Sequence, residues 1–225
     1  MARGGCYGGR CTINKPERSF CLGATSEWIF FMYRALWGSE ALPYNTIIWK
    51  LKLPLKIKVF LWYLYKGVIL TKDNLARQHW QGDNKCCFCS SEETIQHLLF
   101  DCHFASFVWQ IIHVLFNITP PTSVYNFFTD WLFGMNRRLI PEILVGAAAF
   151  CWVIWLTRND LVFDKILAPS YLQVIFRGIY WIRFWSLLQK EEDHQIIMMG
   201  CRKIETAALE MFARNGWRFV NRISV

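Results

Sequence analysis

Residues 86–109 read CCFCSSEETIQHLLFDCHFASFVW, and four of them have the spacing Cys86-x2-Cys89-x7-His97-x4-Cys102. Three thiolates and one imidazole are a typical donor set of a tetrahedral Zn²⁺ site that leaves no coordination position open. A closed site of this kind is structural and not catalytic. The sequence therefore predicts one structural zinc ion, bound by these four side chains.

Two neighbouring residues are alternative ligands. Cys87 competes with Cys86, although it leaves a single residue before Cys89, which is tight for a zinc clip. His103 competes with Cys102, although it could belong to the surface of the next helix. The spacing favours the first set of four.

The local sequence also predicts how the ligands come together. Ser90 and Glu93 have the spacing of a capping box, which indicates a short helix carrying His97. Because His97 and Cys102 are five residues apart, they would point in different directions on one unbroken α-helix. We therefore expect a bend near residues 100–101, with Cys102 opening a second helix.

The composition indicates a large apolar core. The chain has 225 residues, of which 54% are hydrophobic, including 12 Trp and 18 Phe, and this excludes disorder for most of its length. Apolar residues recur with a period near 3.6, and hairpin signals are missing. We therefore expect a mainly α fold: a helical domain with a small CCHC zinc clip between helices, followed by a C-terminal helical region.

Changes in composition predict four parts of the chain. They are a flexible tail over 1–20, a zinc-binding domain over 21–116, a connecting segment over 117–142 and a C-terminal helical region over 143–225. The nine cysteines, an odd number, together with a zinc clip indicate a reducing compartment, and the tail has no apolar stretch of the kind a secretory signal needs.

The C-terminal region is predicted to contain three helices. Their ranges are 142–162, 171–189 and 203–217, with a break at Gly200. The uncharged run 143–156 is shorter than the roughly 20 residues needed to span a bilayer, so it predicts a buried helix. A membrane span is the minority interpretation. Arg158 lies near the end of this helix, where a positive charge interacts favourably with the helix dipole. We prefer this interpretation to a nucleic-acid contact.

Residues 50–80 concentrate positive charge. They hold seven basic residues against Asp73 alone, in a chain of net charge +8. Clustered basic residues with interleaved aromatic residues are typical of surfaces that bind phosphate backbones, so we expect RNA or DNA to bind here. The alternative is that the lysines only solvate one face of a very apolar protein. The candidate contacts are Lys50, Lys52, Lys56, Lys58, Lys66, Lys72 and Arg77.

The local structure of this basic region can also be predicted. Residues 38–45 contain Pro43 and indicate a loop. The alternation KLKLPLKIK favours an extended segment around Pro54, followed by a core helix over 59–70. Thr71 is placed to cap the next helix.

These motifs together resemble the zinc-binding domain that follows the reverse transcriptase in plant non-LTR (LINE-type) retrotransposons. The resemblance covers about residues 30–116. It lies in Ile48-Trp49-Lys50, Leu53-Pro54-x-Lys56-x-Lys58-x-Phe60-x-Trp62, Thr71-x-Asp73-Asn74-Leu75, the Cys86/Cys89/His97/Cys102 clip, Glu93-Thr94-x-x-His97-Leu98 and Cys102-x-x-Ala105-x-x-Val108-Trp109. Downstream, Trp152-x-x-Trp155-x-x-Arg158-Asn159-Asp160-x-Val162-Phe163 is similar to the segment that follows this domain in the same elements.

The resemblance implies a module that holds template RNA or target DNA beside a reverse transcriptase polypeptide, inside the cell and in the nucleus. The sequence has no aromatic-x-Asp-Asp polymerase signature, no endonuclease region and no carboxylate pattern of a ribonuclease H. We therefore expect a non-catalytic module without a small-molecule substrate, and a detached fragment of such an element. Two alternatives are a structural clip that docks onto a polymerase or another protein, and a membrane-associated helical protein.

Overall fold

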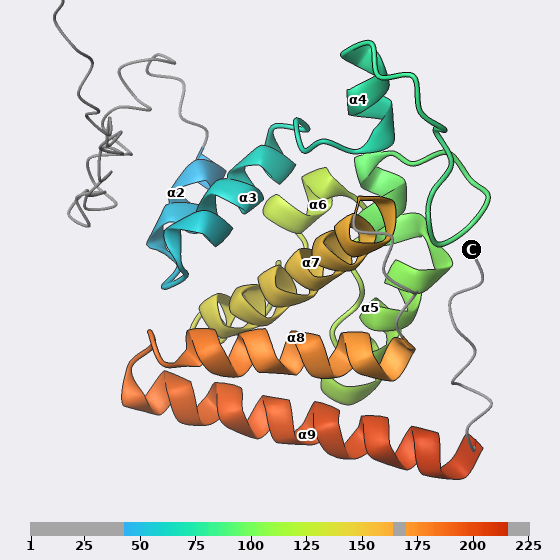
Figure 1. Cartoon of the computed structure of the whole chain (residues 1–225). Helices are drawn as coiled ribbons and strands as arrows, with labels where there is room; N and C mark the ends of the chain where they lie inside the picture. The colour runs from blue at the N-terminus through green and yellow to red at the C-terminus, as the bar shows by residue number, and fades with distance from the viewer. Residues whose placement is uncertain (1–42, 164–169, 216–225) are drawn as a thin grey trace, which may run out of the picture. The chain divides into compact units, whose positions relative to one another are not determined.

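The computed structural model of the chain describes residues 43–163 and 170–215, which are mainly helical (Figure 1). The predicted tail over 1–20 lies outside these ranges. Within them, pairing of extended backbone is limited to one isolated bridge between Lys85 and Glu92, so the predicted mainly α fold is confirmed. The helices are α2 (Pro43–Lys50), α3 (Leu55–Tyr65), α4 (Lys72–Arg77), η1 (His97–Asp101), α5 (His103–Phe116), α6 (Val124–Phe128), α7 (Ile140–Val162), α8 (Tyr171–Ser186) and α9 (Glu191–Asn215).

Helix α7 forms the centre of the core. Residues around its whole circumference are buried, among them Ala148, Phe150, Cys151 and Val153, as expected for a helix that is apolar on all sides. It packs against α3, η1, α8 and α9. By length and composition α7 could also cross a membrane, and 61% of its most apolar 18-residue window is buried inside the structure. The buried helix predicted over 143–156 is therefore confirmed.

Helices α8 and α9 lie side by side along α7 (Figure 1). Ser170 opens α8 with a capping box, in which its hydroxyl accepts the N–H of Gln173 and the Gln173 side chain accepts the N–H of Ser170. The predicted break at Gly200 is wrong, because α9 runs through this residue. A glycine costs a helix only about 1 kcal/mol relative to alanine, and packing against α5, α7 and α8 outweighs that cost.

The segment around Pro54 was predicted to be extended, but it is a short non-helical stretch with a helix on each side. The chain is non-helical only between Lys50 and Leu55, and α3 begins directly after Pro54. Proline fixes φ near the helical value and lacks an N–H that the start of a helix does not need, so it permits a helix to begin here. Helix α2 likewise begins at Pro43, inside the predicted loop.

The helix predicted over 59–70 is also displaced. Helix α3 ends at Tyr65, and Gly67 follows with a positive φ of 69°, which glycine adopts at little cost. Thr71 occupies the predicted N-cap position of α4, where its hydroxyl donates to the Asp73 carboxylate at 2.5 Å.

The connecting segment over 117–142 contains the short aromatic helix α6. Ser123 caps it by accepting the N–H of Asn126 at 3.0 Å. The ring of Phe127 is buried between Trp109 of α5 and Trp131. Phe127 and Trp131 of this segment therefore pack against α5, and the division of the chain at residues 116 and 142 stays a prediction.

Substitution of two mid-helix glycines tests the packing of α7, because the two changes should shift the free energy of unfolding in opposite directions. A Cβ atom at Gly178 of α8 would lie 2.6 Å from the Phe150 ring, whereas a Cβ at Gly146 of α7 would meet nothing within 4 Å. We expect Gly178→Ala to lower the free energy of unfolding by about 1–2 kcal/mol through overpacking. Gly146→Ala should raise it by up to about 1 kcal/mol through helix propensity. Urea denaturation of both variants measures the two changes, and stabilisation by both would show that α7 and α8 are not in close contact.

Candidate metal centre

Cys86 and Cys89 lie on a tight turn between α4 and η1. The turn is closed by hydrogen bonds from the N–H of Cys86 to the Ser91 carbonyl at 2.7 Å and from the N–H of Cys89 to the Cys86 carbonyl at 3.4 Å. The backbone N–H of Phe88 points at the sulfur of Cys86, 3.4 Å away. An N–H donor at this distance stabilises a thiolate, which is the form of cysteine that binds metal.

The second half of the site is a π-helix, η1. The N–H of Cys102 donates to the carbonyl of His97 at 2.7 Å, so the hydrogen bond spans five residues. This wider turn brings His97 and Cys102 to one side, which an unbroken α-helix would not do. The chain then becomes extended at Cys102, which opens α5, as predicted within two residues.

The predicted capping box is wrong. Ser90 is exposed, and the hydroxyl of Thr94 instead accepts the N–H of His97 at 3.0 Å. Glu93 does not turn back to the start of the helix, because its carboxylate is buried against another part of the chain.

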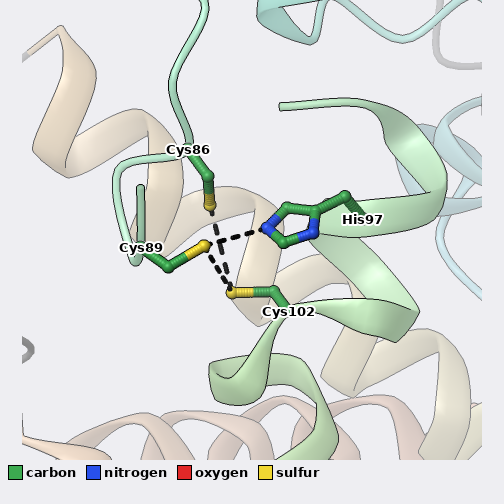
Figure 2. A group of neighbouring side chains, drawn as sticks. All are labelled: Cys86, Cys89, His97 and Cys102. Atoms are coloured by element: carbon green, nitrogen blue, oxygen red, sulfur yellow. Dashed lines mark hydrogen bonds between the residues drawn. The ribbon is translucent and has the colours of Figure 1, made fainter. Parts of the chain in front are cut away.

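The four predicted ligands meet at one point (Figure 2). Their donor atoms all lie within 4.8 Å of one another, with the Cys102 sulfur 4.0 Å from that of Cys86 and 3.9 Å from that of Cys89. Nε2 of His97 lies 3.1 Å from the Cys89 sulfur. A tetrahedral zinc ion with Zn–S bonds of about 2.3 Å holds its sulfur ligands about 3.8 Å apart. The donor set and its spacing therefore fit one structural zinc ion.

The alternative ligands lie outside this group. His103 is exposed at the start of α5, and the Cys87 thiol is not one of the four converging donors. Hydrogen bonds from Cys102 and Cys87 lower the pKa of Cys86, and the same contacts raise the pKa of both donors. Zinc binding requires each coordinating thiol to lose its proton.

Glu93 and Arg158 form a buried ion pair that joins the clip to α7. Both side chains are 0% exposed, and the Arg158 Nη2 and Nε atoms donate to one Glu93 oxygen at 2.7 and 3.0 Å. The same oxygen accepts the backbone N–H of Lys72 at 2.9 Å. The Arg158 guanidinium also lies 5.1 Å from the Trp155 ring centroid.

This ion pair corrects the role predicted for Arg158. Its guanidinium is held by Glu93 and is neither a helix-dipole partner nor exposed to a nucleic acid. Sequence reasoning missed the pair: Glu93 and Arg158 each stand in a motif that carries the family resemblance, but nothing in the sequence links the two.

The seven basic candidates divide into two groups. Lys58 and Lys72 are buried: the Lys58 ammonium donates to the Trp49 carbonyl at 2.9 Å, and that of Lys72 to the Lys85 carbonyl at 2.5 Å. Burial lowers the pKa of Lys58. The other five are exposed, and a nucleic-acid contact for them stays a prediction; they are Lys50, Lys52, Lys56, Lys66 and Arg77.

Substitution of single ligands tests the metal assignment. We expect the purified chain to hold one zinc ion, and Cys89→Ser or His97→Ala to release it, because three remaining donors leave the site open. Cys87→Ser and His103→Ala are matched controls that should retain the ion. Native mass spectrometry gives the stoichiometry of each variant. Loss of zinc from Cys87→Ser with retention in Cys86→Ser would assign the site to the alternative set.

The ion pair is tested by one single and one double substitution. Arg158→Met leaves the Glu93 carboxylate buried without its partner and should lower the free energy of unfolding by about 3–5 kcal/mol. Adding Glu93→Gln removes the buried charge while keeping an acceptor for Lys72, so the double variant should recover part of this loss. Guanidinium denaturation of the zinc-loaded proteins measures both. Equal stability of Arg158→Met and the unmodified chain would contradict the buried contact.

Comparisons with known proteins agree with this geometry. Residues 25–109 match the family model described as zinc-binding in reverse transcriptase. A putative ribonuclease H protein of Arabidopsis thaliana is 25% identical over 114 residues, which cover 48% of this chain and only 17% of the relative. No solved structure matches the chain. Residues 25–109 are thus similar in sequence to the zinc-binding domain of reverse transcriptases, and the Cys₃His cluster lies within the matched region.

Proposed function

We propose that this chain is a non-catalytic, zinc-stabilised module that binds RNA or DNA through the exposed basic residues of α2, α3, α4 and the segments that join them. The matched family is a zinc-binding domain and not a catalytic one. The closed donor set of the cluster leaves no coordination position for a substrate or an activated water. The name of the Arabidopsis relative includes ribonuclease H, but the shared region is 17% of that protein. We therefore assign no nuclease activity to this chain.

The observation that carries this proposal is a run of sequence without any carboxylate. Between Pro43 and Lys72 the chain contains no Asp or Glu, and four lysines of this run are exposed. They are Lys50, Lys52, Lys56 and Lys66. Exposed charges of one sign along a run of the chain attract a polyanion, and every phosphate contact releases counterions, so the binding should weaken as salt rises.

The setting of this binding is part of the proposal, and the family match over residues 25–109 supports it. We propose that the module acts beside a reverse transcriptase of the non-LTR type, in the nucleus, where it would hold template RNA or target DNA. A structural clip that docks onto the polymerase is the second candidate. It is supported by large apolar side chains at the surface of the described residues, such as Phe133 and Tyr125. In that case nucleic acid would be bound by the partner alone.

Removal of three exposed lysines tests the proposal. The triple variant Lys50→Gln, Lys52→Gln and Lys66→Gln should bind a labelled RNA at least about tenfold more weakly, with a salt slope lower by about 2–3, because three phosphate contacts are lost. The matched control removes three exposed charges elsewhere: Arg137→Gln, Lys190→Gln and Arg202→Gln. Fluorescence anisotropy at two salt concentrations measures both effects.

The outcomes of this experiment separate the two candidates. Equal losses of RNA affinity in the two triple variants would show that binding depends only on the net charge of the chain. That result would contradict the assigned binding surface. Absence of RNA and DNA binding at low salt, together with capture of a reverse transcriptase polypeptide, would favour the docking clip instead. Zinc content is measured in every variant, so that loss of the metal centre is not mistaken for loss of a contact.

A further inference from the structure

We propose that one face of α3 is a stacking platform for unpaired bases, so that the module prefers single-stranded nucleic acid. This inference rests on the proposed function and adds the class of nucleic acid and the residue that selects it. The face, here called the α3 stripe, consists of residues three, four or seven positions apart, which share one side of a helix. Its members are Leu55, Lys56, Val59, Trp62, Tyr63 and Lys66.

The α3 stripe lies on the side of the helix away from its buried residues, although Val59 and Trp62 within it are half-buried. The core side of α3 is formed by Ile57, Phe60, Leu61 and Leu64, which are all buried. Helix α3 packs with that side against α2, α6 and α7. Tyr63 on the stripe remains 44% exposed, and Leu55 is exposed as well. The helix therefore has more aromatic surface than its packing uses.

Positive charge lies at both ends of this surface. Lys56 is near the first turn of α3 and Lys66 follows its last residue, and both are exposed. Both ammonium groups lie near aromatic rings, 5.2 Å from the Trp152 centroid for Lys56 and 5.7 Å from the Tyr65 centroid for Lys66. With a rise of 1.5 Å per residue, the two lysines are about 15 Å apart along the helix. A polyanionic strand could thus contact both charges while passing over Tyr63.

An exposed tyrosine between two lysines favours a single strand over a duplex. In a duplex the faces of the bases are covered by their neighbours, whereas in a single strand they are free to stack on an aromatic side chain. The ring of Trp62 lies 5.1 Å from that of Tyr63 at 45° and supports it from one side. Every base has a face that can stack on an aromatic ring, so binding through Tyr63 should depend little on sequence.

The test compares Tyr63→Ala with Tyr63→Phe in the zinc-loaded full chain. Tyr63→Ala should weaken binding of a 12-nucleotide single-stranded RNA at least about tenfold, while Tyr63→Phe keeps the ring and should stay within about twofold. Tyr180→Ala is the matched control, because Tyr180 is 59% exposed and also touches neighbouring rings, but lies on α8. Binding of a duplex of the same sequence should be unaffected by all three substitutions. Fluorescence anisotropy gives each affinity.

An abasic strand identifies the contact itself. It should bind the unmodified chain as weakly as the normal strand binds Tyr63→Ala, and Tyr63→Ala should cost nothing further with it. If Tyr63→Ala leaves single-strand affinity unchanged while the lysine variants weaken it, the platform is refuted and the proposed function survives. If no strand binds at low salt, the proposed function itself is refuted, and the platform with it. Loss of capture of a reverse transcriptase polypeptide by Tyr63→Ala, with RNA affinity unchanged, would assign the stripe to a protein partner.

Discussion

The convergence of three thiols and one imidazole fixes the path of the chain between α4 and α5. Neither half of the clip is long enough to fold alone: one is a four-residue turn, and the other is a π-helix of five residues. Helices this short are unstable in isolation. A metal ion that requires four ligands at fixed distances supplies the missing free energy. Phe88 and Leu98 can then be buried beside it.

The Glu93–Arg158 pair carries this constraint into the rest of the core. A buried ion pair adds little net stability, because desolvation of the two charges offsets their attraction. The pair instead fixes the position of α7 relative to the clip. The buried guanidinium has a carboxylate partner only where Glu93 lies, so a shift or rotation of α7 would leave its charge unpaired. Metal centre and helical core are therefore arranged around one contact, in which the Lys72 backbone also takes part.

The parts of this structure that follow from local chemistry could be predicted from the sequence. The ligand set depends on residue type and spacing, and the buried helix over 143–156 depends on a run of apolar residues. The prediction failed where distant residues decide the local structure. Glu93 has the spacing of a capping residue, but Arg158, 65 positions away, determines its orientation. Lys56 and Lys58 both stand between apolar residues, so their sequence neighbours do not distinguish them. The packing of α3 decides that Lys58 donates to the Trp49 carbonyl while Lys56 is exposed. Gly200 has the appearance of a break, yet packing of α9 against three helices outweighs its weak preference.

The position of Arg158 has a consequence for biosynthesis. By length and composition helix α7 could cross a membrane, so during synthesis its apolar surface needs a protein surface to pack against. The clip is complete once Cys102 has been synthesised, well before Arg158 emerges, and domains generally fold from the N-terminal side during translation. Glu93 has then been synthesised as part of the clip, and its carboxylate becomes buried when Arg158 of α7 docks against it. The order of the chain thus places the synthesis of the clip before that of the long apolar helix that packs against it.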